Sequence, residues 1–338
     1  MPLPFRPNCL PHALGPLPHG AEAAPWELVL PVLAQFPPLP SLAAAGEGLA
    51  ALSLAGFPGA EWEAGFLWDA KALHAGLHAL DVAYLRGAVH SRALALLAVN
   101  ALRERPRLVG KTQAVSVVLW GPFSLALALT NAAWETALAD AAATEALTKH
   151  LHLRLEWFAT VLRPQCRNLV QWLYEPYLPL LGSPFVPWTW AMAGAAWAGT
   201  WSSNAGTQAL WVGAGTALPP VLACAAVELV GVPLPEVEQA VQWAGALRDF
   251  FARKGSIAWG LVPTTSEGLR TATAGRLAAQ FGGVVQALRA AGLPTETLTA
   301  NALVMPDDTL AHLSPREAEH VLQLTNELAA LLRQTYIE

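Results

Sequence analysis

Short apolar runs alternate with longer stretches of helical period along the whole chain. Eight of the short runs end in Gly, Pro or polar residues and are predicted to be strands. Several are continuously apolar, as parallel strands buried on both faces should be. The predicted strands are residues 9–17, 49–57, 114–120, 169–175, 188–198, 222–229, 256–262 and 299–305.

The stretches between these runs have the apolar spacing of amphipathic helices. The last of them carries the clearest start signal, because Ser314 is followed by Pro315 and, three residues on, by Glu317, which together form a capping box. The predicted helical stretches are 24–35, 68–105 (two helices), 131–162, 234–253, 267–291 and 314–336.

Alternating strands and helices predict a parallel sheet, and eight such units predict its closure into a single (β/α)8 TIM barrel. We therefore expect residues 1–338 to form one α/β domain. A doubly wound open sheet is the alternative, but no glycine-rich dinucleotide fingerprint follows the first predicted strand.

The amino-acid composition bears on whether the chain binds nucleic acid or crosses a membrane. Hydrophobic residues make up 54% of the chain and charged residues 13%, with a net charge of −5. No dense run of Lys and Arg occurs, so we expect no nucleic-acid partner. Residues 176–227 contain no Asp, Glu, Lys, Arg or His, yet Pro, Gly, Ser and Asn interrupt every apolar run that could cross a membrane. This segment is predicted to be buried in the barrel and in a homodimer interface.

Cysteine usage points to a reducing compartment. Cys9, Cys166 and Cys224 are few, far apart and odd in number, which argues against a disulfide framework. The proline-rich N-terminus does not have the apolar region of a signal peptide. A cytoplasmic location is expected.

Several motifs occur in the order in which a known superfamily carries them. They are GPLPH (15–19), FPPLPSL (36–42), WGPFSLALAL (120–129), YEPYL (174–178), IAWGLVPT (257–264) and MPDDTLAHLSPREAEHVL (305–322). Together they resemble the catalytic domain of cobalamin-independent methionine synthase, in the superfamily that also contains uroporphyrinogen decarboxylase. The resemblance implies a barrel whose site lies at the carboxyl ends of the strands.

The resemblance also implies a zinc ion that activates homocysteine as a thiolate, because a free thiol with a pKa of about 8.5 is mostly protonated at neutral pH. The family ligands are a His-x-Cys pair after the fifth strand, an acid after the sixth and a Cys after the eighth. Here 195–206 contains neither His nor Cys, Glu228 lies close to the family acid, and Asp307 or Asp308 replaces the last Cys. Glu228 and Asp307 are the candidate metal ligands, and the zinc site is expected to be diverged or lost.

Two residues are predicted to be catalytic. His19 matches the His or Gln of the family's first turn and could bind substrate or move a proton. Glu175 ends the fourth predicted strand in apolar surroundings, where an unpaired carboxylate is costly. The alternative for Glu175 is a structural partner for a loop backbone or an arginine.

Three aromatic residues are predicted to bind substrate. Trp259 could stack on a flat ligand, with core packing as its alternative, and Trp120 and Tyr174 end neighbouring strands. Because Tyr174 replaces the family Asp that holds the amino group of homocysteine, an amino acid bound in the family manner is not expected. Cys9 and His12, with His19, are an alternative place for a relocated metal site.

The leading hypothesis is a methyltransferase-like barrel that acts on a small thiol or related nucleophile, with a methylated folate or corrinoid as the methyl donor. A non-catalytic or regulatory ligand-binding barrel is the main alternative. A uroporphyrinogen decarboxylase-like enzyme ranks third, because it needs arginines for the tetrapyrrole carboxylates and only Arg6 lies near a predicted strand in the first half of the chain.

Overall fold

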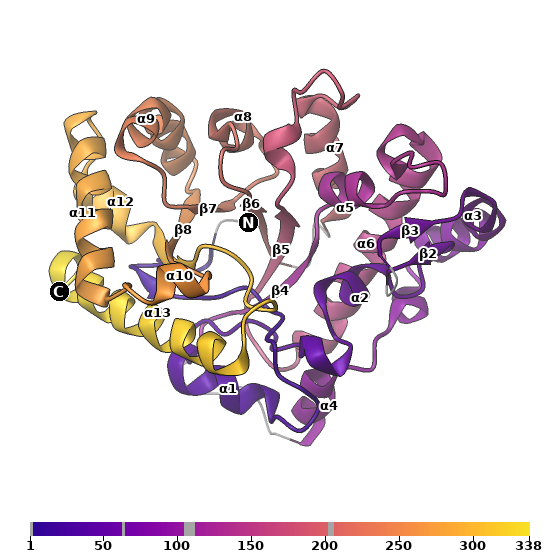
Figure 1. Cartoon of the computed structure of the whole chain (residues 1–338), viewed down its shortest axis with the longest axis horizontal. Helices are drawn as coiled ribbons and strands as arrows, with labels where there is room; N and C mark the ends of the chain where they lie inside the picture. Colours follow the sequence, from indigo (N-terminus) through magenta and orange to yellow (C-terminus); the bar gives the residue numbers. More distant parts are fainter. Residues whose placement is uncertain (1–2, 63–64, 105–111, 202–205) are drawn as a thin grey trace.

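A parallel sheet of seven strands curls through 209° at the centre of the molecule and forms a half-barrel (Figure 1). The computed structural model describes residues 3–62, 65–104, 112–201 and 206–338. The strand order is β1-β9-β8-β7-β6-β5-β4. Their bounds are β1 Leu10–Pro11, β4 Val115–Trp120, β5 Leu169–Glu175, β6 Thr207–Val212, β7 Leu229–Pro233, β8 Ser256–Val262 and β9 Ala302–Pro306.

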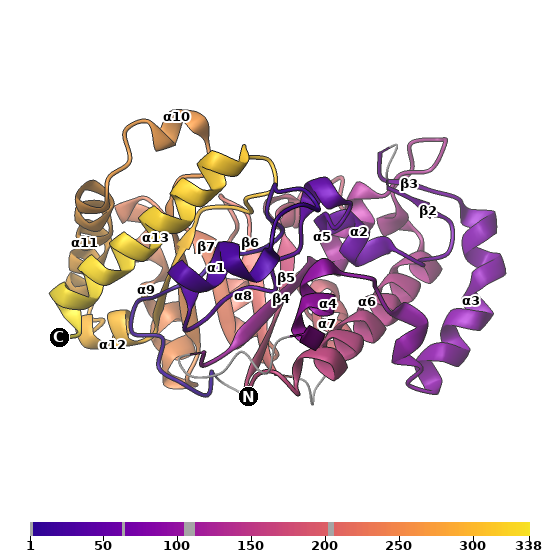
Figure 2. The same ribbon diagram turned by 90° about the horizontal axis from the view of Figure 1, so that it is seen from below.

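Helices surround this sheet (Figure 1), and the strands run from the end near the N-terminus towards the end that carries α10 (Figure 2). A short antiparallel hairpin, β2 Ala60–Glu61 and β3 Leu67–Trp68, lies apart from the sheet. In the described part of the chain, no helix combines the length and the apolar character needed to span a membrane. The helices are α1 Pro25–Leu33, α2 Leu49–Leu54, α3 Ala70–Leu85, α4 Leu97–Glu104, α5 Pro122–Ala128, α6 Ala141–Leu162, α7 Trp190–Thr200, α8 Leu218–Ala223, α9 Val237–Ala252, α10 Ser266–Leu269, α11 Ala274–Ala290, α12 Thr295–Ala300 and α13 Pro315–Tyr336.

The gap between the edge strands β1 and β4 is crossed by the proline-rich segment 36–42. Its single bridges join Leu42 to Leu17, beyond β1, and Pro38 to Ser116 of β4. The prolines of this segment have no N–H to donate, so it cannot form a regular ladder with both neighbours. A TIM barrel has eight strands, whereas the described residues form a sheet of seven, and the irregular segment 36–42 lies between its two edge strands.

Most predicted strands agree with the structure. Segments 169–175 and 256–262 are β5 and β8, segment 114–120 contains β4, and segments 9–17 and 299–305 overlap β1 and β9. The runs that form β4, β5, β8 and β9 are rich in Val, Ile, Leu or aromatic residues and are buried at every strand position, as the continuous apolar pattern indicates.

Three predicted strands are wrong. Segment 49–57 forms α2, segment 188–198 lies largely in α7, and segment 222–229 holds the end of α8 and the turn before β7. In α7, Thr189 caps the helix by accepting a hydrogen bond from the Met192 amide, and the run is rich in Ala and Gly. A buried helix and a buried strand are both uniformly apolar, so such a run does not distinguish them. The true strand β6 was missed.

The predicted helices agree with the structure more closely than the predicted strands do. All six helical stretches contain helices of the structure, and 68–105 contains two, α3 and α4. The capping box of α13 is present: the Ser314 side chain accepts from the Glu317 amide, and the Glu317 carboxylate accepts from the Ser314 amide. Local side-chain chemistry fixes the start of α13, which is why the sequence alone reveals it.

A buried histidine joins the two edges of the half-barrel on its concave face. His12 follows β1, and its Nδ1 lies 2.9 Å from the Phe36 carbonyl oxygen, to which it must donate. Its Nε2 therefore accepts from the Trp172 indole N–H at 3.2 Å and lies 3.1 Å from Ser116 Oγ. The His12 ring also stacks on Phe36 at 3.9 Å between centroids. Burial lowers the pKa of His12 to about 3, so the ring is neutral at neutral pH.

Replacing His12 with alanine is expected to destabilise the fold by roughly 3–5 kcal/mol. The change opens a cavity in the interior and leaves the Trp172 indole N–H and the Phe36 carbonyl without their partner. Urea unfolding at pH 7.5 measures the effect. His78→Ala, on the exposed face of α3, is the matched control, and equal losses in the two variants would contradict the assigned role.

Candidate functional site at the carboxyl ends of the strands

A tyrosine–carboxylate pair bridges two strand ends at the carboxyl edge of the sheet. Tyr174 on β5 donates its hydroxyl to Asp308, which follows β9, over 2.6 Å. Burial and the neighbouring Asp308 carboxylate raise the pKa of Tyr174, so the phenol keeps its proton and remains a donor. Asp308 also accepts from the Thr309 amide. The carboxyl edge of such a sheet is where active sites of α/β barrels collect.

Aromatic rings form a wall beside this pair. Trp120, at the end of β4, meets Tyr174 edge-on at 5.5 Å between ring centroids and Phe66 at 5.4 Å. Tyr177 lies 5.8 Å from the Trp120 ring. Two of the three predicted substrate-binding residues, Trp120 and Tyr174, are therefore brought together, and both are largely buried.

Asp307, beside this pair, is held in place by Thr264 at the end of β8. Its carboxylate accepts from the Thr264 amide at 2.9 Å and from the Thr264 hydroxyl at 2.7 Å. Burial raises the pKa of Asp307, and the two hydrogen bonds from Thr264 act against this shift. The result is a fixed carboxylate that is more basic than one in water.

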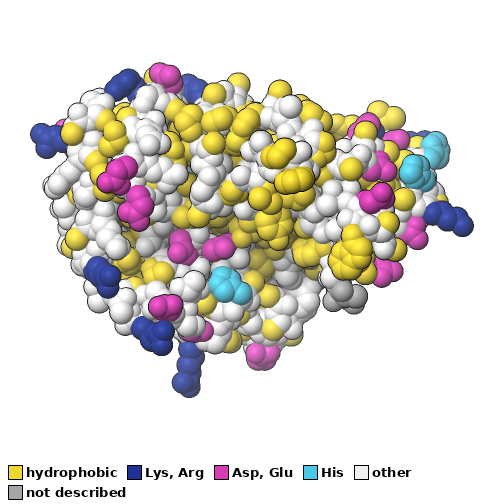
Figure 3. Space-filling model, turned by 45° about the horizontal axis from the view of Figure 1, so that its top comes forward, with side chains coloured by type: hydrophobic (Ala, Val, Ile, Leu, Met, Phe, Trp, Pro, Cys, Tyr) yellow, Lys and Arg dark blue, Asp and Glu magenta, His cyan; other side chains and the backbone are white. Residues whose placement is uncertain are grey.

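Asp307 faces a cavity of about 570 Å³ at the carboxyl ends of β7 and β8. This volume is in the range of small-molecule sites. Figure 3 shows a hollowed face of the molecule on which hydrophobic, acidic and histidine side chains gather. The lining comes from the segment after β7, the end of β8, and helices α10 and α11, and its charged members are Glu236, Arg276 and Asp307.

His19, predicted to be catalytic, lies in the loop after β1 and contacts α13. Its Nε2 is 3.0 Å from a carboxylate oxygen of Glu319, so this nitrogen carries the hydrogen that is donated. The other ring nitrogen, Nδ1, is buried and has no hydrogen-bond partner among the residues that the structure describes. His19 is 7% exposed, whereas the Glu319 side chain is 52% exposed. No interaction found in the structure joins His19 to Asp307 or Asp308.

Glu175, the other predicted catalytic residue, points away from the concave face. Side chains alternate along a strand, so Tyr174 and Glu175 lie on opposite faces of the sheet. The Glu175 carboxylate accepts from the Phe123 and Ser124 amides at the start of α5, at 3.2 and 2.6 Å, and from the Trp197 indole of α7 at 2.8 Å. The structure thus provides the backbone partner that was the alternative for Glu175.

Trp259, the third predicted substrate-binding residue, also lies on the helix side of the sheet. It is 1% exposed and packs against Phe281 of α11, with ring centroids 6.3 Å apart. This matches the core-packing alternative and corrects the prediction of a stacking surface at the mouth. The next residue, Gly260, lines the cavity instead.

The two candidate metal ligands lie at opposite ends of the parallel sheet. Glu228 directly precedes β7 and accepts from the Gln208 amide at the amino end of β6, whereas Asp307 directly follows β9. One ion cannot bridge them, so the prediction of a joint site is corrected. No group of three or more His, Cys, Asp or Glu side chains within the described residues is arranged to hold a metal ion.

The family zinc does not fit the donor set at the carboxyl edge. In the family, the His-x-Cys pair follows the fifth strand, and the strand that takes this position here is β6. The residues after β6 are Gly213, Ala214 and Gly215, which have no metal-binding side chain. Segment 195–206, which is predicted to follow the fifth strand, lies instead at the end of α7 and partly outside the described residues. The carboxylates after β9 are held by Thr264 and Tyr174.

The relocated metal site at the first strand does not form either. Both ring nitrogens of His12 are occupied by other groups. Cys9 lies at the amino end of β1, where its thiol hydrogen-bonds the Thr299 carbonyl, and burial raises its pKa to about 12. A thiol that stays protonated is a poor metal ligand.

Sequence inspection missed several polar residues of this site. Thr264 ends the motif IAWGLVPT and could have been selected as the residue that follows a strand. Glu236, Arg276 and Glu319 lie on or beside helices, and only the three-dimensional packing brings them to the carboxyl edge.

No protein-family model and no curated protein matches the chain. Among solved structures, it is similar to a B12-independent methionine synthase from Shewanella sp. W3-18-1, with 10% identity, a TM-score of 0.47 and coverage of 66% of this chain and 63% of the other. A methyltransferase from Methanosarcina mazei has 14% identity, a TM-score of 0.45 and coverage of 72% and 64%. A GH99 endo-alpha-mannosidase from Bacteriodes thetaiotaomicron has 9% identity, a TM-score of 0.26 and coverage of 66% and 81%.

This chain spans less than two thirds of the length of the first two of these proteins. Likenesses of this degree carry no argument about activity. The function must therefore be inferred from the site itself.

Glu175→Gln is expected to change how stability depends on pH. Burial raises the pKa of Glu175 from 4.5 to about 7, so the folded protein binds this proton more tightly than the unfolded chain. The free energy of unfolding that this group contributes therefore falls as pH rises from about 4.5 to 7, by roughly 3 kcal/mol. Glutamine keeps the shape of the side chain without ionising, so the variant gains stability relative to wild type across this window.

Urea unfolding from pH 4.5 to 8 measures this difference. Comparison with wild type is essential, because His12 titrates in an overlapping window with the opposite sign. Glu327→Gln, on an exposed position of α13, controls for the loss of one carboxyl group. A wild-type-minus-variant difference that is constant with pH would show that Glu175 ionises normally.

Proposed function

We propose that this chain is a methyltransferase-like barrel that methylates a small thiol or related nucleophile at the carboxyl ends of β7, β8 and β9, with Asp307 as the general base. The observation that carries the proposal is the fixed Asp307 carboxylate, with its raised pKa, on the wall of a cavity of about 570 Å³.

The chemistry needs a group that removes the proton of the nucleophile. A carboxylate whose pKa is raised towards neutrality is a better general base than an ordinary aspartate. As the nucleophile attacks the methyl carbon, its proton passes to Asp307, and the donor leaves with the electron pair of the broken bond. A methylated folate or corrinoid would serve as donor. In the family that the sequence resembles, coordination to zinc removes the proton of the thiol. Here Asp307 removes that proton, so this step requires no metal.

The cavity also offers charges for binding. Arg276 can pair with a substrate carboxylate, and Glu236 with a cationic group, since both side chains are exposed at its edge. These groups differ from the family's amino-group partner, whose position is taken by Tyr174. A thiol that carries a carboxylate is therefore the substrate class we propose.

A ligand-binding barrel without catalysis is the second candidate. It is favoured by the exposed charges of the cavity, Glu236 and Arg276, which can bind a ligand whether or not a methyl group is transferred. A tetrapyrrole decarboxylase is not proposed, because Arg276 is the one arginine among the described residues that line the cavity.

Asp307→Asn is expected to lower the rate of methyl transfer about 10²–10³-fold, because the amide cannot accept the proton. Wild type and variant are incubated with homocysteine or a simpler mercapto-carboxylate and with a methylated folate or methylcobalamin, and the thioether is measured by mass spectrometry. Thiol binding, measured by calorimetry, should change by less than about threefold. The wild-type rate should fall at low pH as Asp307 is protonated.

Asp249→Asn, on the exposed face of α9, is the matched control and should retain the wild-type rate. Thiol binding without methyl transfer from either donor would favour the ligand-binding candidate. Failure to bind any of the thiols would refute both.

The uncharged segment 176–227 is proposed to form a homodimer interface. It exposes large apolar side chains outside the core, with Phe185 93%, Leu180 48% and Met192 45% exposed. Sedimentation at micromolar concentration is expected to show two chains, and Phe185→Asp should shift the protein to one chain. Leu85→Asp, at an 82% exposed position on α3, should not. A wild-type protein that sediments as a single chain would refute the dimer.

A further inference from the structure

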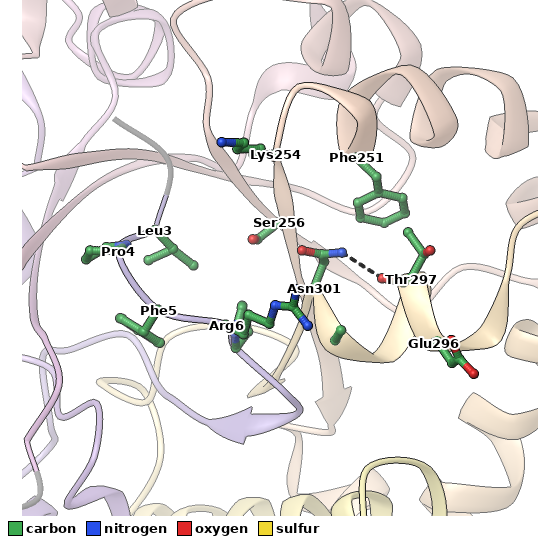
Figure 4. Close-up of a pocket in the computed structure, with 12 residues that line it drawn as sticks. Leu3, Pro4, Phe5, Arg6, Phe251, Lys254, Ser256, Glu296, Thr297 and Asn301 are labelled. Carbon is green, nitrogen blue, oxygen red and sulfur yellow. Dashed lines mark hydrogen bonds between the residues drawn. The ribbon is translucent and has the colours of Figure 1, made fainter.

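A second and larger cavity lies at the opposite end of the sheet, outside the amino ends of β8 and β9 (Figure 4). Its volume is about 710 Å³. Ser256 is the first residue of β8, Asn301 directly precedes β9, and Arg6 belongs to the segment that leads into β1. Nothing in the proposed methyl transfer uses this end of the molecule.

The charge in this cavity is predominantly positive. Arg6 and Lys254 line it from two different segments, and Glu296 is the one carboxylate among the described residues of the lining. Both cations are exposed, and neither forms an ion pair with another described residue. In a chain whose net charge is −5, these two unpaired cations make the cavity locally positive, which favours an anionic ligand.

Two polar side chains can add hydrogen bonds. Asn301 donates through Nδ2 to the Thr297 carbonyl at 2.8 Å, which fixes its amide and leaves Oδ1 as an acceptor. Figure 4 shows this oxygen turned away from Thr297, on the side of Ser256. The Ser256 hydroxyl can donate or accept. Phe5 and Phe251 line the same cavity and offer apolar walls.

The backbone at Lys254 gives an independent reason to assign this residue a function. The Lys254 amide donates to the Phe251 carbonyl and the Gly255 amide to the Phe250 carbonyl, which is the Schellman ending of a helix, here α9. Lys254 takes the left-handed position of this motif, with φ +66°, where glycine is normally found. A lysine here is less stable than a glycine, and strained residues of this kind cluster at functional sites.

We propose that this cavity binds a small organic phosphate. A phosphate monoester carries a charge between about −1.5 and −2 at pH 7, which matches Arg6 and Lys254 together better than a carboxylate does. The Arg6 and Lys254 head groups lie apart in Figure 4, and both end long, exposed side chains that turn towards the phosphate when it binds. The phosphate oxygens then accept from these cations and from Ser256, and in the monoprotonated form the P–OH donates to Asn301 Oδ1. Its organic part lies between the apolar walls.

Phenyl phosphate is a suitable probe, and calorimetry with the full-length protein measures its binding. Wild type should bind phenyl phosphate at least tenfold more tightly than inorganic phosphate, which lacks the aromatic ring, or phenol, which lacks the phosphate. Arg6→Gln and Lys254→Gln should each weaken binding about tenfold, and raising the salt concentration should weaken wild-type binding. Lys71→Gln on the distant helix α3 and Arg86→Gln at its C-terminal cap, both at exposed positions, are the matched controls.

Lys254→Gly separates a binding role from a structural one. The variant should unfold at a temperature a few degrees higher, because glycine relieves the left-handed backbone, while phenyl phosphate binding falls about tenfold. Unchanged binding in both Lys254 variants, or equal losses in the α3 controls, would overturn the proposal, as would the absence of wild-type binding at about 10 mM. Methyl transfer at the carboxyl end of the sheet should be unaffected by these substitutions. The two proposals are therefore tested by separate measurements, and one can fail without the other.

Discussion

The structure depends on how the half-barrel joins its two edge strands. Between β1 and β4 there is no regular strand, because segment 36–42 contains prolines that cannot complete two hydrogen-bond ladders. The junction is supplemented by side chains: His12 beyond β1 bonds the Phe36 carbonyl and receives the Trp172 indole N–H from β5. A neutral imidazole is suited to this position because it can donate on one side and accept on the other without introducing a buried charge.

This junction also determines where ligands can lie. The interior beside His12 is filled by Trp172 and Trp211. Residue 231 faces these rings and is a glycine, because a side chain there would collide with the Trp211 ring. The interior of the sheet is filled by rings, and the two cavities described above lie at its two ends. Polar groups then collect at the strand ends, where loops from distant parts of the chain meet.

The sequence was sufficient for the architecture where the signal was local. The capping box at Ser314, and the continuous apolar strands β5 and β8, follow from residues close together in the chain. It was insufficient where the outcome depended on which face a residue occupies. Glu175 and Tyr174 are neighbours, yet one caps α5 on the helix side and the other meets Asp308 on the concave side. The apolar run of α7 resembles a buried strand, and counting it as one shifts the order of the later strands, which places Glu228 at the carboxyl end although it lies at the amino end.

The two ends of the sheet differ in charge, and this difference separates their chemistry. The carboxyl end gathers Asp307, Asp308 and Glu319, whereas the amino end presents Arg6 and Lys254. Asp307, a largely buried carboxylate with a raised pKa, is suited to accept a proton, and exposed cations are suited to hold an anion. Because a core of tryptophan rings lies between them, a ligand at one end cannot contact a ligand at the other. Any communication between the ends must pass through the strands themselves, and β8 and β9 are the direct route, since each has one end at each cavity.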